Sequence, residues 1–277
     1  MNKVAFVTGA SRGIGRETAL AFARAGFDLA ISARSVDEGQ SHTHGLRNPD
    51  GTVLPGSLNA TAAAIRELGR KVLVVPMDLL DSASVLAASQ AVFAEYGRVD
   101  VLINNAIYQG SDLNAPFMEL QPQTLERVFQ GYMMTPVLLT QAVVSRMLEQ
   151  GGGVVINVTS GAGESDPPVA AAKGGWGYAY GAGKAAVSRL SGILSVEFGD
   201  QGIRAYTLNP GVVTTDALRA TLGEKGVIAL RAGSAPPHVP AAVMVWLATD
   251  DAALDHQRKT IHCQPFAREY AIVADWH

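Results

Sequence analysis

Short, almost continuous apolar runs alternate along this chain with longer segments in which apolar residues recur every three to four positions. The short runs are rich in β-branched residues, which is typical of strands buried on both faces of a parallel sheet. They predict strands at residues 4–8, 29–33, 72–76, 99–104, 154–159, 203–208 and, from a weaker pattern, 259–263. The longer segments predict helices at about 14–25, 58–68, 82–96, 122–149 and 178–198, the fourth bent by Pro136 because proline has no amide hydrogen to donate.

This alternation predicts an α/β fold: a Rossmann-like, doubly wound, seven-stranded parallel sheet with helices on both faces, in a three-layer α/β/α arrangement. No repeat or linker divides the chain, so residues 1–277 are expected to form a single domain. Two polar, turn-rich insertions, 35–56 and 161–177, interrupt the alternation. Both exceed the ~12–15 residues of ordinary loops, which indicates that each is either functional or poorly ordered.

The composition narrows the class of protein. The 277 residues carry a net charge of -3, with 48% hydrophobic and 17% charged residues, which excludes a disordered or fibrous chain and gives no basic run for nucleic acid or an anionic membrane. The single cysteine, Cys263, excludes an internal disulfide framework and is compatible with a reducing compartment. A strand-like segment begins at Lys3, leaving no room for a signal peptide, and no apolar run reaches transmembrane length. We therefore expect a soluble cytoplasmic protein.

A glycine-rich turn, "VTGASRGIGRETA", joins the first predicted strand to the first predicted helix. Gly9, Gly13 and Gly15 allow a tight turn and let backbone N–H groups approach a pyrophosphate at the N-terminus of the helix. Their G-x-x-x-G-x-G spacing differs from the general G-x-G-x-x-G fingerprint. The position of the turn, at the crevice of a parallel sheet, predicts a nucleotide-binding site.

The end of the second strand indicates which nucleotide binds. A carboxylate there would accept hydrogen bonds from the adenosine ribose and repel a 2′-phosphate, but this chain has Ala33 and Arg34, with no acid until Asp37. Arg12 in the glycine turn supplies a second guanidinium, and two guanidiniums favour NADP(H) over NAD(H) through charge-assisted hydrogen bonds. The alternative is that both arginines are ordinary solvated side chains.

Tyr180 and Lys184 are four residues apart in "YGAGK", so they lie one turn apart on one face of the predicted helix. The pKa of a free phenol is about 10, and an adjacent ammonium or an oxidised nicotinamide would lower it. Such a phenol can exchange a proton with a carbonyl–alcohol pair. Ser160 ends the fifth strand, at the edge of the sheet where ligands bind, and is expected to hold the substrate oxygen. The alternative is that Tyr180 is a core phenol.

These motifs together resemble the short-chain dehydrogenase/reductase family over nearly the whole chain. The resemblance is carried, in order, by "TGASRGIG", "DLLD", "NNA", "INVTS", "YGAGK" and "NPGVVTT". It implies that Tyr180 is the acid/base, that Lys184 lowers its pKa and holds the nicotinamide ribose, and that Ser160 positions the substrate oxygen. For the cofactor it implies Gly9, Ser11, Arg12, Gly13, Ile14, Gly15, Arg34, Asp78, Leu79, Asn105, Ala106, Tyr180, Lys184, Pro210, Gly211, Val213 and Thr215.

Three departures from the family pattern concern the substrate side. Ile107 replaces the glycine of "NNAG", and Tyr132, preceded by Gly131, stands where the family has an asparagine that holds a relay water beside the lysine. We expect the Tyr132 hydroxyl to pair with Lys184 as a possible proton relay; the alternative is that its ring fills the site. The long 161–177 connection adds a wall containing Trp176. The substrate pocket is expected from Ile107, Tyr108, Ser160, Gly161 and Trp176.

The sequence therefore predicts an NADP(H)-dependent oxidoreductase that interconverts a ketone or aldehyde and an alcohol. One alternative is NAD(H) dependence; another, left open by Ile107 and Tyr132, is a catalytically weak nucleotide-binding sensor or scaffold. A nucleotide-sugar epimerase is disfavoured because little chain remains after the sheet for a sugar-binding domain. The H-x-H pair of His42 and His44 has no acidic or cysteine partner fixed nearby, so no metal site is expected.

The expected partners are a small carbonyl or alcohol substrate and further copies of the same chain. Helices 122–149 and 178–198 carry more apolar faces than one side of a sheet would cover, and family members often pair these helices across a two-fold axis, so a homodimer or homotetramer is expected. The substrate would be shaped by the loops at 107–118, 161–177 and 212–238, whose sequences follow no transferable code.

Overall fold

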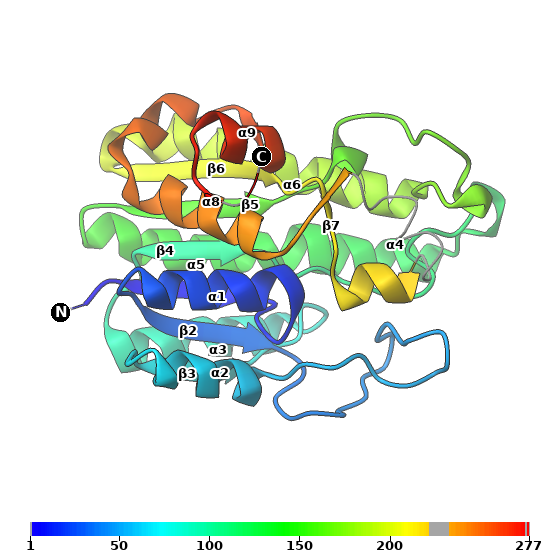
Figure 1. Ribbon diagram of the computed structural model, residues 1–277, viewed down its shortest axis with the longest axis horizontal. Coiled ribbons are helices and arrows are strands. Elements are labelled where there is room, and N and C mark those ends of the chain that lie inside the picture. Colours follow the sequence, from blue (N-terminus) through cyan, green and yellow to red (C-terminus); the bar gives the residue numbers. More distant parts are fainter. Residues whose placement is uncertain (1, 222–232, 275, 277) are drawn as a thin grey trace.

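The computed structural model describes residues 2–221, 233–274 and 276. Its main sheet has seven parallel strands in the order β3-β2-β1-β4-β5-β6-β9 (Figure 1). The strands are β1 Val4–Thr8, β2 Asp28–Ala33, β3 Val72–Pro76, β4 Val101–Asn104, β5 Gly153–Val158, β6 Ile203–Asn209 and β9 Thr260–His262. The predicted doubly wound sheet is therefore confirmed. Because the chain builds outward in both directions from β1, its topological switch point lies between β1 and β4.

Helices cover both faces of this sheet, which makes three layers. One core lies under α1 Gly13–Arg24, α2 Leu58–Glu67, α8 His238–Thr249 and α9 Cys263–Glu269. The other core lies under α3 Ser82–Tyr96, α5 Thr135–Glu149 and α6 Tyr178–Phe198. Side chains alternate between the two cores along each strand: in β1, Val7 packs on the first and Phe6 on the second, and both are fully buried.

The long helix predicted at 122–149 has three parts. It begins as α4 Pro122–Val128, continues through a π-helical turn, η2 Phe129–Met134, and ends as α5. Pro136 lies in the first turn of α5, where a missing amide hydrogen costs least. The Thr135 hydroxyl donates to the carbonyl of Gln130 at 2.9 Å, so a side chain helps to satisfy the widened turn. Tyr132 lies in this turn.

The region after β6 differs most from the expectation. No helix was predicted there, yet α8 packs against α1 and is buried on most of its surface. Its sequence, "HVPAAVMVWLAT", is apolar on nearly all sides and lacks the one-sided pattern that predicts a surface helix. Two short strands, β7 Val212–Val213 and β8 Ser234–Ala235, pair within the loop predicted at 212–238, and its residues 222–232 lie outside the described part of the chain.

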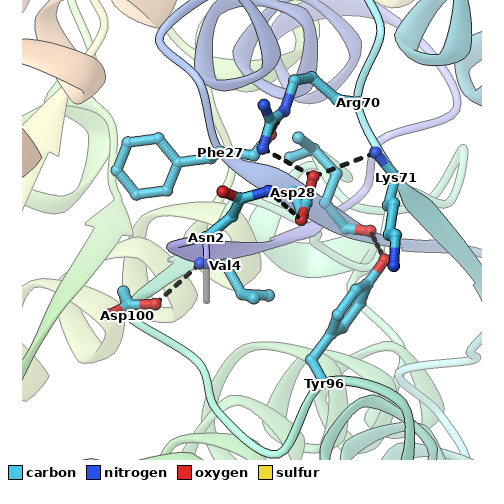
Figure 2. A network of polar contacts seen from close by, with 9 residues as sticks. Asn2, Val4, Phe27, Asp28, Arg70, Lys71, Tyr96 and Asp100 are labelled. Carbon is cyan, nitrogen blue, oxygen red and sulfur yellow. Dashed lines mark hydrogen bonds and ion pairs between the residues drawn. The ribbon is translucent and has the colours of Figure 1, made fainter.

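A polar network closes the amino ends of the strands (Figure 2). Buried Asp28 accepts hydrogen bonds from Asn2 Nδ2 at 3.0 Å, Arg70 Nη2 at 2.8 Å and the Lys71 amide at 3.1 Å. Burial alone would raise the pKa of Asp28, but these hydrogen bonds and the Arg70 charge hold it below its usual value. The network ties β2 to both its neighbours at this edge, and the chain's candidate chemistry lies at the opposite, carboxyl edge.

Candidate active site

The glycine-rich turn connects β1 to α1 at the switch point of the sheet. Gly9 and Gly13 have φ values of 71° and 56°, which favour glycine, and a Cβ on Gly15 would approach Asn105 Nδ2 to 2.6 Å and collide with the Gly9 carbonyl. The turn is held from β4, because the Thr8 hydroxyl accepts from the amides of Asn105 and Ala106 at 3.0 Å each. Among the described residues no side chain caps the first turn of α1, which leaves its amides available to an anion.

A cleft of ≈280 Å³ opens at this turn along the carboxyl edge of the sheet. Twelve of the residues predicted to bind the cofactor line it: Gly9, Ser11, Arg12, Gly13, Ile14, Gly15, Arg34, Asp78, Leu79, Asn105, Ala106 and Thr215. Their segments lie as far apart in the sequence as Gly9 and Thr215, and the parallel sheet brings them to one edge. The Asp78 carboxylate accepts from the Leu80 amide at 2.9 Å, which fixes the turn after β3.

The proline–glycine turn after β6 is predicted to contact the nicotinamide end of the cofactor. A side chain of α9 holds it in place. Gln264 Nε2 donates to the carbonyl of Val212 at 2.8 Å, and a Cβ on Gly211 would lie 2.7 Å from that nitrogen. Gly211 also has a φ of 69°, so two separate constraints require glycine at this position. The described residues that line the cleft do not include Pro210, Gly211 or Val213, so this turn lies outside the cleft.

Arg12 and Arg34 make contacts that the sequence does not indicate. Arg12 Nη2 donates to the Gly56 carbonyl at 3.0 Å and to Ser35 Oγ at 3.3 Å, and Arg34 Nη1 donates to the Thr43 carbonyl at 3.0 Å. All three acceptors belong to the 35–56 insertion. The insertion thereby forms one wall of the cleft, contributing Gln40, Ser41, His42, Leu46, Arg47, Val53 and Leu54 to its lining. Its location directly after β2 is the sequence signal that could have placed it there.

Ser160, Tyr180 and Lys184 come together where β5 meets α6. Ser160 directly follows Thr159 at the end of β5, and its hydroxyl lies near enough to the phenol of Tyr180 to lower the pKa of that phenol. Lys184 is buried, and its Nζ donates to the Val158 carbonyl at 2.9 Å. The turn after Ser160 approaches α6 closely, since a Cβ on Gly163 would collide with the backbone of Lys184. A phenol beside a serine hydroxyl, one helical turn from a lysine, can move a proton to or from a bound oxygen.

Burial controls the titration of both residues on α6. It raises the pKa of Tyr180 above its usual value, and the nearby Ser160 hydroxyl opposes this only in part. Burial also lowers the pKa of Lys184 to about 7, so this side chain loses charge as the pH rises through neutrality. The expectation of a lowered Tyr180 pKa is wrong for the protein by itself, because desolvation of the phenol outweighs every other influence on it.

The expected hydrogen bond between Tyr132 and Lys184 is also wrong. Tyr132 is 1% exposed, and its hydroxyl donates to the backbone carbonyl of Tyr108 at 3.0 Å. Its ring, instead, faces the site: the ring centroid lies 5.8 Å from Lys184 Nζ and 6.4 Å from that of Tyr180, in an edge-on arrangement. A Cβ on Gly131 would lie 2.9 Å from that of Tyr108, so this contact also needs glycine before Tyr132. The ring therefore fills the site beside the lysine.

Of the five residues predicted to form the substrate pocket, the described lining of the cleft contains Ile107 and Tyr108. Ile107 lines the cleft, whereas Tyr108, which also lines it, is 3% exposed and has its hydroxyl occupied by Asp112 at 2.7 Å and Arg127 Nε at 3.0 Å. Burial would raise the pKa of Asp112, but hydrogen bonds from Thr124, Tyr108 and Arg127 lower it to about 2. Nothing in the sequence pattern marks this network, which fixes the loop after β4 to α4. Trp176 is half-buried at the start of α6, near Gly181.

No group of three or more His, Cys, Asp or Glu side chains that could hold a metal ion occurs within 2–221, 233–274 and 276. In the same ranges, no helix combines the length and the apolar character needed to cross a membrane.

Comparison with known proteins assigns the chain and its fold to one family. The family profile described as short chain dehydrogenase matches residues 3–55 and 53–225. D-threitol dehydrogenase of Mycolicibacterium smegmatis is 34% identical over 264 residues, which cover 91% of this chain and 88% of that protein. The 7alpha-hydroxysteroid dehydrogenase of Escherichia coli is 28% identical over 220 residues, covering 79% and 74% of the two chains.

Solved structures give the same result. The crystal structure of 3-oxoacyl-[acyl-carrier protein] reductase from Brucella melitensis in complex with NAD has a TM-score of 0.78 and 25% identity, covering 95% of this chain and 96% of that one. The acetoin dehydrogenase from Enterobacter cloacae has a TM-score of 0.74 and 25% identity over 95% and 94% of the chains. These relatives are oxidoreductases of alcohols and carbonyl compounds by name.

Proposed function

The chain belongs to the short-chain dehydrogenase family, an oxidoreductase family acting on alcohols and carbonyls with NAD(P), and from this premise we propose that it is an NADP(H)-dependent oxidoreductase that uses Tyr180 as its acid/base. The observation that carries the proposal is the placement of Ser160, Tyr180 and Lys184 at the same sheet edge as the glycine-turn cleft. The substrate is a ketone or aldehyde in one direction and an alcohol in the other.

When bound, the nicotinamide cofactor supplies or accepts a hydride at carbon. The protein's own residues handle the oxygen and its proton. The Ser160 hydroxyl is close enough to Tyr180 to affect its pKa, so both hydroxyls are assigned to one substrate oxygen, and the raised pKa keeps Tyr180 protonated at neutral pH. A protonated phenol is the acid required to complete carbonyl reduction. Lys184, held against Val158, is positioned to stabilise the phenolate that remains.

Support for NADP(H) comes from Arg12 and Arg34, which line the adenosine end of the cleft, with no carboxylate directly after β2. Glu38 and Asp216 lie close enough to affect the pKa of Arg12, but burial is the larger influence on it, and Glu38 accepts from the Gly56 amide at 3.0 Å.

We expect Arg34→Asp to weaken NADPH binding by about 10–100-fold, the value of a charge-assisted hydrogen bond, while changing NADH binding little. Calorimetric titration with both cofactors measures this, and equal affinities in the unmodified protein would refute the preference.

The proposal as a whole is tested by following NADPH oxidation with a panel of ketones, aldehydes, steroids and quinones. Turnover with at least one carbonyl class is expected, and it should be faster with NADPH than with NADH. A protein that binds NADPH but turns over no carbonyl compound and oxidises no alcohol would instead fit the nucleotide-binding sensor.

We also propose that the protein assembles as a homodimer or homotetramer in the cytoplasm. The outer faces of η2, α5 and α6 expose Met133, Met134, Val137, Ile193 and Val196, which a second copy could cover. Light scattering at micromolar concentration should give a multiple of 29.0 kDa, and Val196→Lys should lower it. A monomeric mass for the unmodified protein would contradict this assembly.

A further inference from the structure

Two buried nitrogen atoms beside the glycine turn have no hydrogen-bond partner among the described residues. They are Arg12 Nε and His42 Nε2, and both residues line the cleft. A buried donor or acceptor without a partner is costly, and native proteins rarely keep one unless a ligand or water completes it. The two atoms come from segments thirty residues apart, yet both lie at one cleft. This indicates a single ligand that completes both of them.

The 35–56 insertion that carries His42 is closely packed against the glycine turn. A Cβ on Gly56 would approach Arg12 Cβ to 2.9 Å and the Ser11 carbonyl to 2.5 Å, and Gly56 has a φ of 107°. Leu54 is 2% exposed. Within the insertion, Arg47 donates to Ser41 Oγ at 2.6 Å and to the Gly51 carbonyl at 3.0 Å. These contacts hold the segment containing His42 in place over the cleft.

Three charged groups, besides burial, influence the pKa of His42. They are Arg34, Asp78 and Arg12, of which Arg34 has the largest effect. Asp78 follows β3 and is expected to contact the adenine, whereas the two arginines are expected to face the adenosine ribose. Burial, followed by the Arg34 charge, lowers the pKa of His42, so its ring is neutral at neutral pH. A neutral imidazole has one N–H to donate.

We propose that His42 is a third ligand of the cofactor's 2′-phosphate, beside Arg12 and Arg34, and that the 35–56 insertion is the wall that presents it. This inference rests on the proposed NADP(H) dependence. The phosphate oxygens accept one hydrogen bond from the imidazole and others from the guanidiniums, which completes Arg12 Nε and His42 Nε2 together. The insertion is thus a determinant of cofactor choice built into this chain.

The test uses adenosine 2′,5′-bisphosphate and adenosine 5′-monophosphate, which differ only in the 2′-phosphate and contain no nicotinamide. Calorimetric titration of the whole chain should give tighter binding of the bisphosphate. His42→Ala should weaken bisphosphate binding by about 10-fold or more and leave monophosphate binding within about two-fold, as expected for loss of one hydrogen bond to a charged group. His42→Gln, whose amide can donate from a similar distance, should recover most of the loss.

His44→Asn is the matched control, because His44 lies in the same insertion but not in the cleft lining, and asparagine tolerates its φ of 58°. It should bind both ligands as the unmodified protein does. Equal weakening of both ligands by His42→Ala, or no weakening, would overturn the role of His42 while leaving the NADP(H) preference intact. If the unmodified protein does not discriminate between the ligands, the cofactor proposal fails, and this inference fails with it.

Discussion

Replacing Tyr180 with phenylalanine is expected to lower turnover by about 10²–10⁴-fold, the usual contribution of a general acid or base. The change keeps the ring that packs edge-on against Tyr132 and removes only the hydroxyl, which lies beside Ser160. Steady-state kinetics with the carbonyl substrate identified by the screen measures the loss. NADPH affinity should remain close to that of the unmodified protein, because the hydroxyl acts on the substrate oxygen.

Tyr178 provides the control for this substitution. It lies in the first turn of the same helix and is 59% exposed, with its ring against Phe117. Tyr178→Phe removes a phenol hydroxyl only two residues from Tyr180 in the sequence. Because this hydroxyl is on an exposed side chain, turnover should be nearly unchanged. Near-normal activity of Tyr180→Phe would show that another group handles the proton.

Gly15→Ala is expected to abolish most nucleotide binding. The added methyl group would collide with the carbonyl of Gly9 and lie 2.6 Å from Asn105 Nδ2, so the glycine turn and the end of β4 must move apart. Overpacking of this kind costs about 1–3 kcal/mol of stability. A displacement of about 1 Å at the cofactor site can cost ~10²-fold in activity. Thermal unfolding and cofactor titration separate the two effects.

Gly199→Ala is the matched glycine control. Gly199 follows α6 with helical dihedrals, φ -58° and ψ -44°, and apart from its neighbours along the chain no described atom lies within 4 Å of the added Cβ. Alanine there should leave cofactor binding unchanged and stability equal or higher by roughly 0.5–1 kcal/mol. If Gly15→Ala binds NADPH as well as Gly199→Ala does, the cofactor does not sit on this turn.

The parts predicted well from the sequence are those determined by local patterns. The bounds of α6 and β1 agree with the structure because a continuous periodic pattern and nearby glycines mark their ends. Helix α8 was missed because its buried position makes it apolar on nearly all sides, which removes the periodic signal. The same reason makes any fully enclosed helix difficult to recognise.

The site was predictable where motifs fix the residues and not where distant segments meet. Parallel strands necessarily bring Ser160 and the glycine turn to one edge of the sheet. The hydrogen bond from Tyr132 to the Tyr108 carbonyl depends on the path of the loop after β4, and that from Arg12 to Gly56 joins residues 44 apart. Neither contact leaves a pattern in the sequence, so the filled relay site and the wall over the cleft became visible only in three dimensions.

Transfer of deuterium from the cofactor to carbon tests the central claim most directly. The purified protein is incubated with NADPH carrying deuterium at both C4 positions and with the carbonyl panel, and the alcohols are analysed by mass spectrometry. We expect deuterium on the carbinol carbon of at least one product with the unmodified protein, and little or none with Tyr180→Phe under the same conditions. Bound NADPH with no deuterated alcohol from any carbonyl compound, or equal labelling by Tyr180→Phe, would contradict the account.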